Sequence, residues 1–286
     1  MSDRFREAYS QRSVTFNRRM DRQLTIICAL TFVIHLIGTL AYAVRIAGVR
    51  TGRIAVSFAL FNILVLVSRT SNSFQGPFLA KRIERNISNG VTQGLLTDFR
   101  WILLSATVAT FAGALLIPTF QRLFSRAVLH FQIHRSVPAL LMHGFFKGGL
   151  SQLRENASMP SVANMTGLRR GHGISATMLT MNVLAVALWT IGVFAALYAG
   201  YLNPALRVTS SSLSSVVNGI ATIMMFVFID PHMSVMTDDV VDGRTSQSQF
   251  RRAVVWLVGT RLAGTLLGQA LLVPAALTIV SVAKAM

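Results

Sequence analysis

Long apolar stretches separated by polar connections dominate this sequence. Six of them reach the roughly 20 residues that a helix needs to cross the hydrocarbon core of a bilayer. In lipid, every backbone polar group must find a partner within the protein, and a helix meets this requirement inside one segment. The pattern therefore predicts an all-α fold, a polytopic integral membrane helical bundle with about six transmembrane helices. The predicted spans cover residues 24–48, 54–78, 101–120, 174–201, 208–229 and 253–282.

The segments outside the spans are polar and basic. Residues 1–23 form a basic N-terminal tail, and residues 24–286 form the six-span membrane domain. Within the segment 121–173, basic and apolar residues alternate as in an amphipathic helix lying in the membrane interface, followed by a loop. Pro118 is expected to end or kink the third span. When the long segment is left out, basic residues are more numerous on the side of the tail, which favours a cytoplasmic N-terminus.

The charge balance narrows the class of partner. Only 13% of the residues are charged, against about 25% in soluble domains. The net charge of +17 would suggest nucleic acid in a soluble protein, but the apolar runs are too long for that reading. Membrane lipids and an anionic lipid head group are therefore the expected partners. The single cysteine, Cys28, excludes an intramolecular disulfide.

Polar residues recur at helical spacing in four of the spans. Residues three or four positions apart lie on one face of a helix. The first two spans are joined by a very short turn at residues 49–53, so they are antiparallel neighbours whose polar faces can converge. These faces could line a cavity or serve helix packing. They comprise Thr31, His35, Gly38, Tyr42 and Arg45; then Asn62, Arg69, Asn72 and Gly76; then Ser211, Ser215, Asn218 and Thr222; then Arg261, Thr265, Gly268 and Gln269.

Four arginines lie in or beside the first two spans. A guanidinium near hydrocarbon is costly, so an intramembrane arginine is a functional-site hypothesis by default. Their proximity indicates a shared anionic partner. Asp230 stands at a membrane edge and is the best candidate for a carboxylate that pairs with such an arginine or takes up a proton. The four are Arg45, Arg50, Arg53 and Arg69.

Two neighbouring blocks of sequence carry a family resemblance. The first reads Tyr42-Ala-Val-Arg45-Ile-Ala-Gly48-Val-Arg50-Thr-Gly52-Arg53, and the second reads Leu60-Phe-Asn62-Ile-Leu-Val-Leu-Val-Ser68-Arg69-Thr. They resemble the Amj family, the alternates to MurJ, with which chain length and number of spans also agree. The resemblance implies a bacterial lipid II flippase in the cytoplasmic membrane. Such a protein moves the undecaprenyl-pyrophosphate-linked peptidoglycan precursor for cell wall biogenesis, as a transporter rather than an enzyme and without a cofactor.

A site hypothesis follows from the arginines and this substrate class. The planar guanidinium fork binds phosphate oxygens bidentately and keeps its charge. We expect Arg45, Arg69 and Arg261 to line a central cavity, with Arg50 and Arg53 at its mouth. His35 and Asp230 are candidates for proton coupling. Hydrogen bonds to the sugars, or completion of the path, are expected from His35, Tyr42, Asn62, Asn218 and Gln269.

Other readings stay open on the residues alone. A membrane enzyme acting on polyprenyl phosphates has little support, because Ser125, Arg126 and His130 match a lipid-phosphatase pattern only faintly. A small-solute transporter or channel is harder to exclude; transporters commonly show repeated halves, and no clear internal repeat is predicted here.

Metal binding and self-association have weaker sequence signals. His130 and His134 are spaced as zinc ligands, but no carboxylate accompanies them, so no metal site is expected. Asp238, Asp239 and Asp242 lack the calcium-loop pattern. A ridge of small residues, Thr260, Gly264 and Gly268, could pack within the chain or form a homodimer.

Overall fold

A computed structural model describes residues 21–90, 94–134, 155–158 and 173–286 of the chain. Within these residues, six helical segments are long and apolar enough to cross a membrane, and no strand occurs. The predicted all-α polytopic bundle is confirmed. The first four spans are α2 (Arg22–Thr51), α3 (Ile54–Ser88), α4 (Leu95–His134) and α8 (Ala176–Leu202), and the sixth is α12 (Gln247–Ala285). The basic tail 1–20 lies outside the described residues.

The fifth span is an interrupted helix. It consists of η2 (Pro204–Leu206), α9 (Arg207–Ser212), α10 (Ser214–Met224), the π-helix η3 (Met225–Ile229) and α11 (Asp230–Val241). A π-helical turn accommodates one extra residue inside a helix and often occurs at functional sites. Discontinuous spans of this kind are typical of membrane transporters.

The third span is longer than the hydropathy predicted. Residues 121–134 continue α4 through Pro118, whereas the sequence predicted a separate interfacial helix from residue 121. The reason is packing, because Phe124 and Val128 are buried and Phe124 meets Phe61 of α3 edge-on at 6.4 Å between ring centroids. Apart from residues 155–158, the rest of the predicted amphipathic and loop segment lies outside the described residues.

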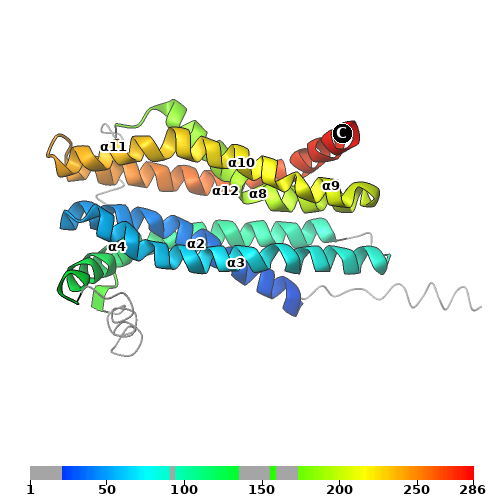
Figure 1. Cartoon of the computed structure of the whole chain (residues 1–286), viewed down its shortest axis with the longest axis horizontal. Helices are drawn as coiled ribbons and strands as arrows, with labels where there is room; N and C mark the ends of the chain where they lie inside the picture. The colour runs from blue at the N-terminus through cyan, green and yellow to red at the C-terminus, as the bar shows by residue number, and fades with distance from the viewer. Residues whose placement is uncertain (1–20, 91–93, 135–154, 159–172) are drawn as a thin grey trace, which may run out of the picture.

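The spans form two groups of three, drawn in Figure 1 as two layers. In one group α2 packs between α3 and α4, and in the other α8 packs between α10 and α12. Between the groups, α4 contacts α12, α2 contacts α11 and α12, and α8 contacts α3 and α4. The predicted small-residue ridge is used inside the chain, because Gly264 and Gly268 lie against Val186 and Ile191 of α8.

The turn between α2 and α3 depends on two glycines. Gly52 ends α2 in the left-handed conformation with φ of 64°, which a side chain rarely adopts. Gly48 lets the next helix approach, because a Cβ there would lie 3.1 Å from the Cα of Ile54. This close reversal makes α2 and α3 the antiparallel neighbours that the sequence predicted.

A buried ionic network joins α2, α3 and α4 at the other end of this group. Arg82 Nη1 lies 2.6 Å from Asp21 Oδ2, and Arg82 Nη2 lies 2.9 Å from Asp98 Oδ2. Asp21 also caps α2 by accepting a hydrogen bond from the Leu24 amide. Partial burial would raise the pKa of Asp21, but the bonds from Leu24 and Arg82 outweigh it and hold that pKa below its usual 3.8. The stabilisation from Asp21 is therefore full above pH 3.8 and is lost as the pH falls through the lowered value.

Arg82→Ala is expected to destabilise the protein by about 3 kcal/mol, because it leaves the buried Asp98 carboxylate without this partner. Thermal unfolding of the purified protein in detergent measures the effect. The matched control is Arg85→Ala, which removes an exposed guanidinium three residues further along the same helix. Equal unfolding temperatures for the two variants would contradict the structural role of the network.

Candidate functional site

The polar face of α2 meets α11 and α12 in a buried cluster of charged and polar side chains. Arg45 Nη2 lies 3.1 Å from Asp230 Oδ1, and its guanidinium also lies over the Phe58 ring, 5.2 Å from the centroid. Arg45 thereby joins α2 to α3 and to α11. The expected pairing of Asp230 with an intramembrane arginine is found. The Asp230 side chain is 43% exposed, against 14% for Arg45, so the pair is open on the side of the carboxylate.

Arg261 of α12 enters the same cluster without a carboxylate partner among the described residues. It is 8% exposed, and its Nε makes no hydrogen bond. The guanidinium lies against Gly38, where any Cβ would collide with it. Nδ1 of His35 is also buried without a partner, and Arg261 acts electrostatically on both His35 and Tyr42. Buried polar groups without partners are costly, so this cluster is suited to receiving an anionic ligand.

The π-helix positions the carboxylate of this cluster. Asp230 is the first residue after η3, and Ile229 just before it is buried. The isoleucine packs with Ile46 and Met233 in a hydrophobic cluster that holds α11 against α2. The local sequence thus places an acidic side chain beside Arg45 at the point where the fifth span changes its helical winding.

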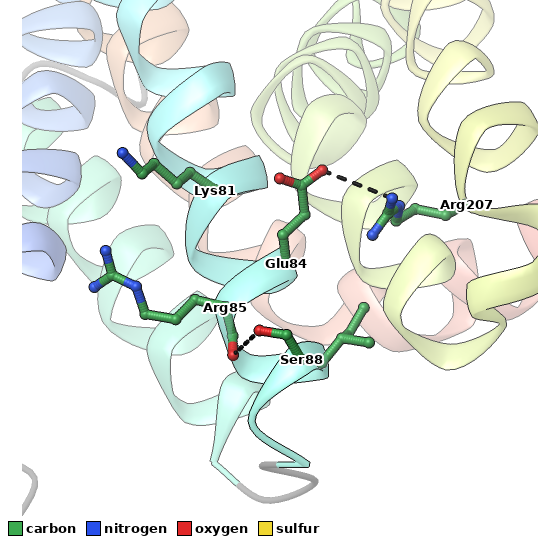
Figure 2. A pocket seen from close by; sticks show the side chains of 6 residues that line it. Lys81, Glu84, Arg85, Ser88 and Arg207 are labelled. Atoms are coloured by element: carbon green, nitrogen blue, oxygen red, sulfur yellow. Dashed lines mark hydrogen bonds and ion pairs between the residues drawn. The ribbon is translucent and has the colours of Figure 1, made fainter.

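A second polar feature is a recess at the far end of α3, shown in Figure 2. It has a volume of about 540 Å³. Glu84 of α3 points toward Arg207 of α9, with 3.8 Å between Oε1 and Nη2. An adjoining pocket of about 150 Å³ shares Glu84 and Arg207 with it and reaches Leu197 of α8. The recess is lined by Lys81, Glu84, Arg85, Ile87, Ser88 and Arg207, so it holds three cations and one carboxylate.

The sequence does not predict this recess as a site. Its basic residues bear there only on the orientation of the chain in the membrane. The signal that could have found it is the spacing of Lys81, Glu84 and Arg85 at the end of a predicted span, but its partner Arg207 is distant in sequence. The ends of α3 and α8 come together only through the packing of the two groups of spans.

The remaining predicted site residues lie apart from the buried cluster. Arg50 and Arg53 are exposed at the α2–α3 turn, and Asn62 and Arg69 are exposed on α3. Asn218 packs against Gly192 of α8, with its Oδ1 buried and without a partner. Gln269 Nε2 donates to the Arg100 carbonyl at 3.1 Å, and Arg100 Nη1 donates to Gln269 Oε1 at 3.2 Å. Of the predicted residues, the structure brings together His35, Tyr42, Arg45, Arg261 and Asp230.

Arg69 nevertheless lies at the same depth as the cluster. The antiparallel register of α2 and α3 pairs Gln23 with Phe78, Thr31 with Gln75 and Arg45 with Phe58, which sets Arg69 opposite residues 32–37. It is therefore level with His35, near the middle of the span. Arg69 also lies eleven residues before Ala80, about three helical turns, so both are on one face of α3. Because Ala80 lines the apolar pocket against Leu197, this face of α3 is turned toward the second group of spans.

These features define the class of the protein. The chain is a multi-pass helical membrane protein, and within the described residues Arg261 lies in the middle of the bundle without a carboxylate partner, an arrangement typical of proteins that handle anionic solutes or lipids. Residues 30–283 match the Amj family, described as Alternate to MurJ, and the chain belongs to this family. The family predicted from the two sequence blocks is thereby confirmed.

One curated relative is similar over most of the chain. It is named Lipid II flippase Amj, comes from Bacillus subtilis (strain 168), and is 37% identical over 262 residues. The match covers 89% of this chain and 94% of the relative. No solved structure matches the chain significantly.

Replacing Gly38 with Ala is expected to lower stability by about 1–3 kcal/mol relative to Gly76→Ala, because the new methyl group collides with the Arg261 guanidinium. Gly76 is also helical, but a Cβ there meets no atom within 4 Å. Both substitutions gain the same helix propensity, so the difference in thermal unfolding between them isolates the collision. Equal shifts in the two variants would show that Arg261 does not occupy the space beside Gly38.

Proposed function

We propose that this chain is a lipid II flippase of the bacterial cytoplasmic membrane and that it moves its lipid without altering it chemically. The observation that carries the proposal is the buried guanidinium of Arg261, held against Gly38 without a carboxylate partner among the described residues. A site of this kind suits a pyrophosphate, which supplies the missing negative charge. Family membership and the name of the Bacillus relative support the same conclusion.

The recess between α3 and α9 is the first binding site for the head group. Lys81, Arg85 and Arg207 attract the pyrophosphate, and Arg207 offers the bidentate geometry that phosphate oxygens prefer. The adjoining pocket shares Glu84 and Arg207 with the recess and adds the apolar side chains of Ile83, Leu197 and Val208, so charged and apolar parts of one lipid find suitable surfaces side by side. Exposed apolar residues on the fifth span, including Val216, Ile220, Ile223 and Phe226, keep the polyprenyl tail in the bilayer.

The head group then crosses between the two groups of spans. Arg69 and Asn62 meet it on the exposed face of α3, and Arg261, His35 and Tyr42 meet it on the buried side at the same depth. Arg45 continues this path toward the turn between α2 and α3. Arg50 and Arg53 stand at the far mouth, while Asn218 and Gln269 complete the hydrogen bonding along the route.

Flipping is tested in liposomes that contain the purified protein and fluorescent lipid II. Arg45→Ala, Arg69→Ala and Arg261→Ala are each expected to slow transfer about 10–100-fold, since each removes a charge-assisted hydrogen bond worth roughly 1.5–3 kcal/mol. Arg122→Ala, on the exposed surface of α4, serves as the control.

Two results would overturn the proposal. Full activity of the triple alanine variant would exclude a role for these guanidinium groups. Chemical change of the lipid, rather than unchanged lipid in the opposite leaflet, would instead identify the membrane enzyme that the sequence left open. Transfer is scored by accessibility to a membrane-impermeant quencher, and chemical identity by mass spectrometry of the recovered lipid.

Asp230 also couples transport to protons in this proposal, because protonation of its carboxylate weakens the ion pair with Arg45. Asp230→Asn is expected to make the flipping rate insensitive to a pH gradient across the liposome membrane, while the parent chain responds. A gradient response that survives in Asp230→Asn would assign the coupling elsewhere, with His35 as the next residue to replace.

A further inference from the structure

The two groups of three spans are repeats of each other. Before the first turn, residues 42–48 read Tyr-Ala-Val-Arg-Ile-Ala-Gly, and residues 194–200 read Phe-Ala-Ala-Leu-Tyr-Ala-Gly. In the third helix of each group, residues 110–118 read Thr-Phe-Ala-Gly-Ala-Leu-Leu-Ile-Pro, and residues 265–274 read Thr-Leu-Leu-Gly-Gln-Ala-Leu-Leu-Val-Pro. These correspondences favour an internal repeat, which the hydropathy pattern alone did not predict.

Burial follows the same correspondence. The buried face of α4 recurs in α12 with every position shifted by 155 residues, so that Leu95 corresponds to Phe250 and Thr110 to Thr265. The matching residues in α4 are Leu95, Asp98, Phe99, Ile102, Leu103, Ala106, Ala109, Thr110 and Gly113. Those in α12 are Phe250, Ala253, Val254, Leu257, Val258, Arg261, Gly264, Thr265 and Gly268.

The second helices correspond as well, and the π-helix explains their one irregularity. Ser57 and Ser210 are both fully buried with an unpartnered hydroxyl, 153 positions apart. Further along, Leu79 and Met233 are both buried and lie 154 positions apart. The extra residue falls between Ser210 and Met233, the interval that contains η3 (Met225–Ile229). A π-helical turn is the usual accommodation of one inserted residue.

The two repeats have opposite orientations in the membrane. Each contains three spans, an odd number, so the second repeat begins on the side where the first ends. In Figure 1, α3 and the α9–α11 span run in opposite directions along the long axis. Inverted repeats of this kind are a known architecture of transporters that open alternately to the two sides of the membrane.

Two contacts between the repeats correspond to each other but differ in their side chains. The contact of α2 with α11, here called the first seam, corresponds to that of α8 with α3, the second seam. On the first seam, Arg45 and Asp230 form an ion pair. On the second seam, the corresponding residues are Leu197 and Gly76, which carry no charge, and a pocket of about 150 Å³ lies beside Leu197. One seam is closed by a charge pair at 3.1 Å, whereas its counterpart has two uncharged residues at these positions and a pocket bordered by the longer Glu84–Arg207 pair at 3.8 Å.

We propose that the Arg45–Asp230 pair closes a second mouth for the anionic head group, between α2 and α11, which opens when the recess between α3 and α9 closes. This inference rests on the proposed function and adds to it the site of release. A lipid bound at the recess would pass the mid-membrane guanidinium groups and leave by the second mouth. The two mouths occupy corresponding positions in the two repeats.

The charges at the two mouths favour one direction. At the end of the fifth span, Asp238, Asp239 and Asp242 occupy the positions of Glu84, Arg85 and Ser88 in α3. Arg244 bridges Asp239 and Asp242 at 2.9 and 2.8 Å, while Arg50 and Arg53 are exposed at the neighbouring α2–α3 turn. The second mouth therefore holds as many carboxylates as cations, whereas the recess is lined by three cations and one carboxylate. A pyrophosphate is attracted more strongly to the recess, which the positive-inside rule places in the cytoplasm.

A cleavable cross-link tests whether the second mouth must open. Cysteines replace Val49 and Met233, which lie about one turn beyond Arg45 and Asp230 and pack in one hydrophobic cluster. The background variant is Cys28→Ala, which removes the single native cysteine. Bridging the pair with a short bifunctional thiosulfonate is expected to reduce lipid II transfer roughly tenfold or more, because closure of a required opening becomes rate-limiting. Reduction of the bridge restores the rate.

The matched control is a cross-link inside one repeat. Ser105→Cys placed beside native Cys28 joins α4 to α2, where Ser105 Oγ now donates to the Cys28 carbonyl at 2.7 Å. This bridge is expected to leave transfer unchanged, since the repeats move as units. If residues 49 and 233 are bridged and transfer continues at the rate measured without the bridge, the second mouth is overturned.

A labelling experiment separates this inference from the identity of the lipid. Val49→Cys is exposed to a membrane-impermeant thiol reagent from outside, with and without Asp230→Asn. Loss of the ion pair is expected to raise the labelling rate about tenfold, as for a shift of roughly 1.4 kcal/mol toward the open state. An unchanged rate overturns the second mouth whatever the chain carries. A raised rate in a protein that does not move lipid II supports the mouth and counts against the proposed substrate.

Discussion

The cost of holding guanidinium groups within membrane-spanning helices constrains the rest of this structure. Arg45 meets that cost with a carboxylate and an aromatic ring, because Asp230 and Phe58 both contact it. Arg261 meets it only in part, with Gly38 making room and Nε left without a partner. In a soluble protein, water could solvate such groups, but here each guanidinium must pair with another part of the chain or with a bound ligand. The packing of α2 against α11 and α12 is built around this requirement.

The correspondence between the two groups of spans shows where their charges differ. Both groups have a glycine before the first turn and the same buried positions in the third helix, although α2 ends at Gly52 in the left-handed conformation and α8 ends at Asn203 in another one. The charges differ, since Ala106 stands where α12 has Arg261, and Leu197 stands where α2 has Arg45. One seam is therefore held by the Arg45–Asp230 pair, while its counterpart carries no charge at these two positions. In the proposed change of state, this inequality gives the two mouths different roles.

Much of the fold could be predicted from the sequence, because hydropathy over 20 residues decides whether a helix spans a membrane. The continuation of α4 past Pro118 could not, since it depends on Phe124 packing against Phe61, a residue of another helix. The spacing of polar residues predicted one face of α2, and the place of Asp230 at a membrane edge predicted a pairing with an arginine, which the structure shows with Arg45. The pairing of Asp230 with Arg45 rather than another arginine depends on contacts across 185 positions, which spacing within one helix cannot reveal.

The single extra residue in the π-helix has a consequence for how such a protein could arise. One residue advances an α-helix by 100°, so an insertion turns everything after it toward a different neighbour. In the fifth span the residue that follows η3 is Asp230, and the turned segment presents it to Arg45. Its counterpart in the uninterrupted α3 is Gly76, which touches no other side chain. After an ancestral duplication, one inserted codon would thus turn this segment toward α2, and substitutions such as the one that distinguishes Asp230 from Gly76 would supply the charges.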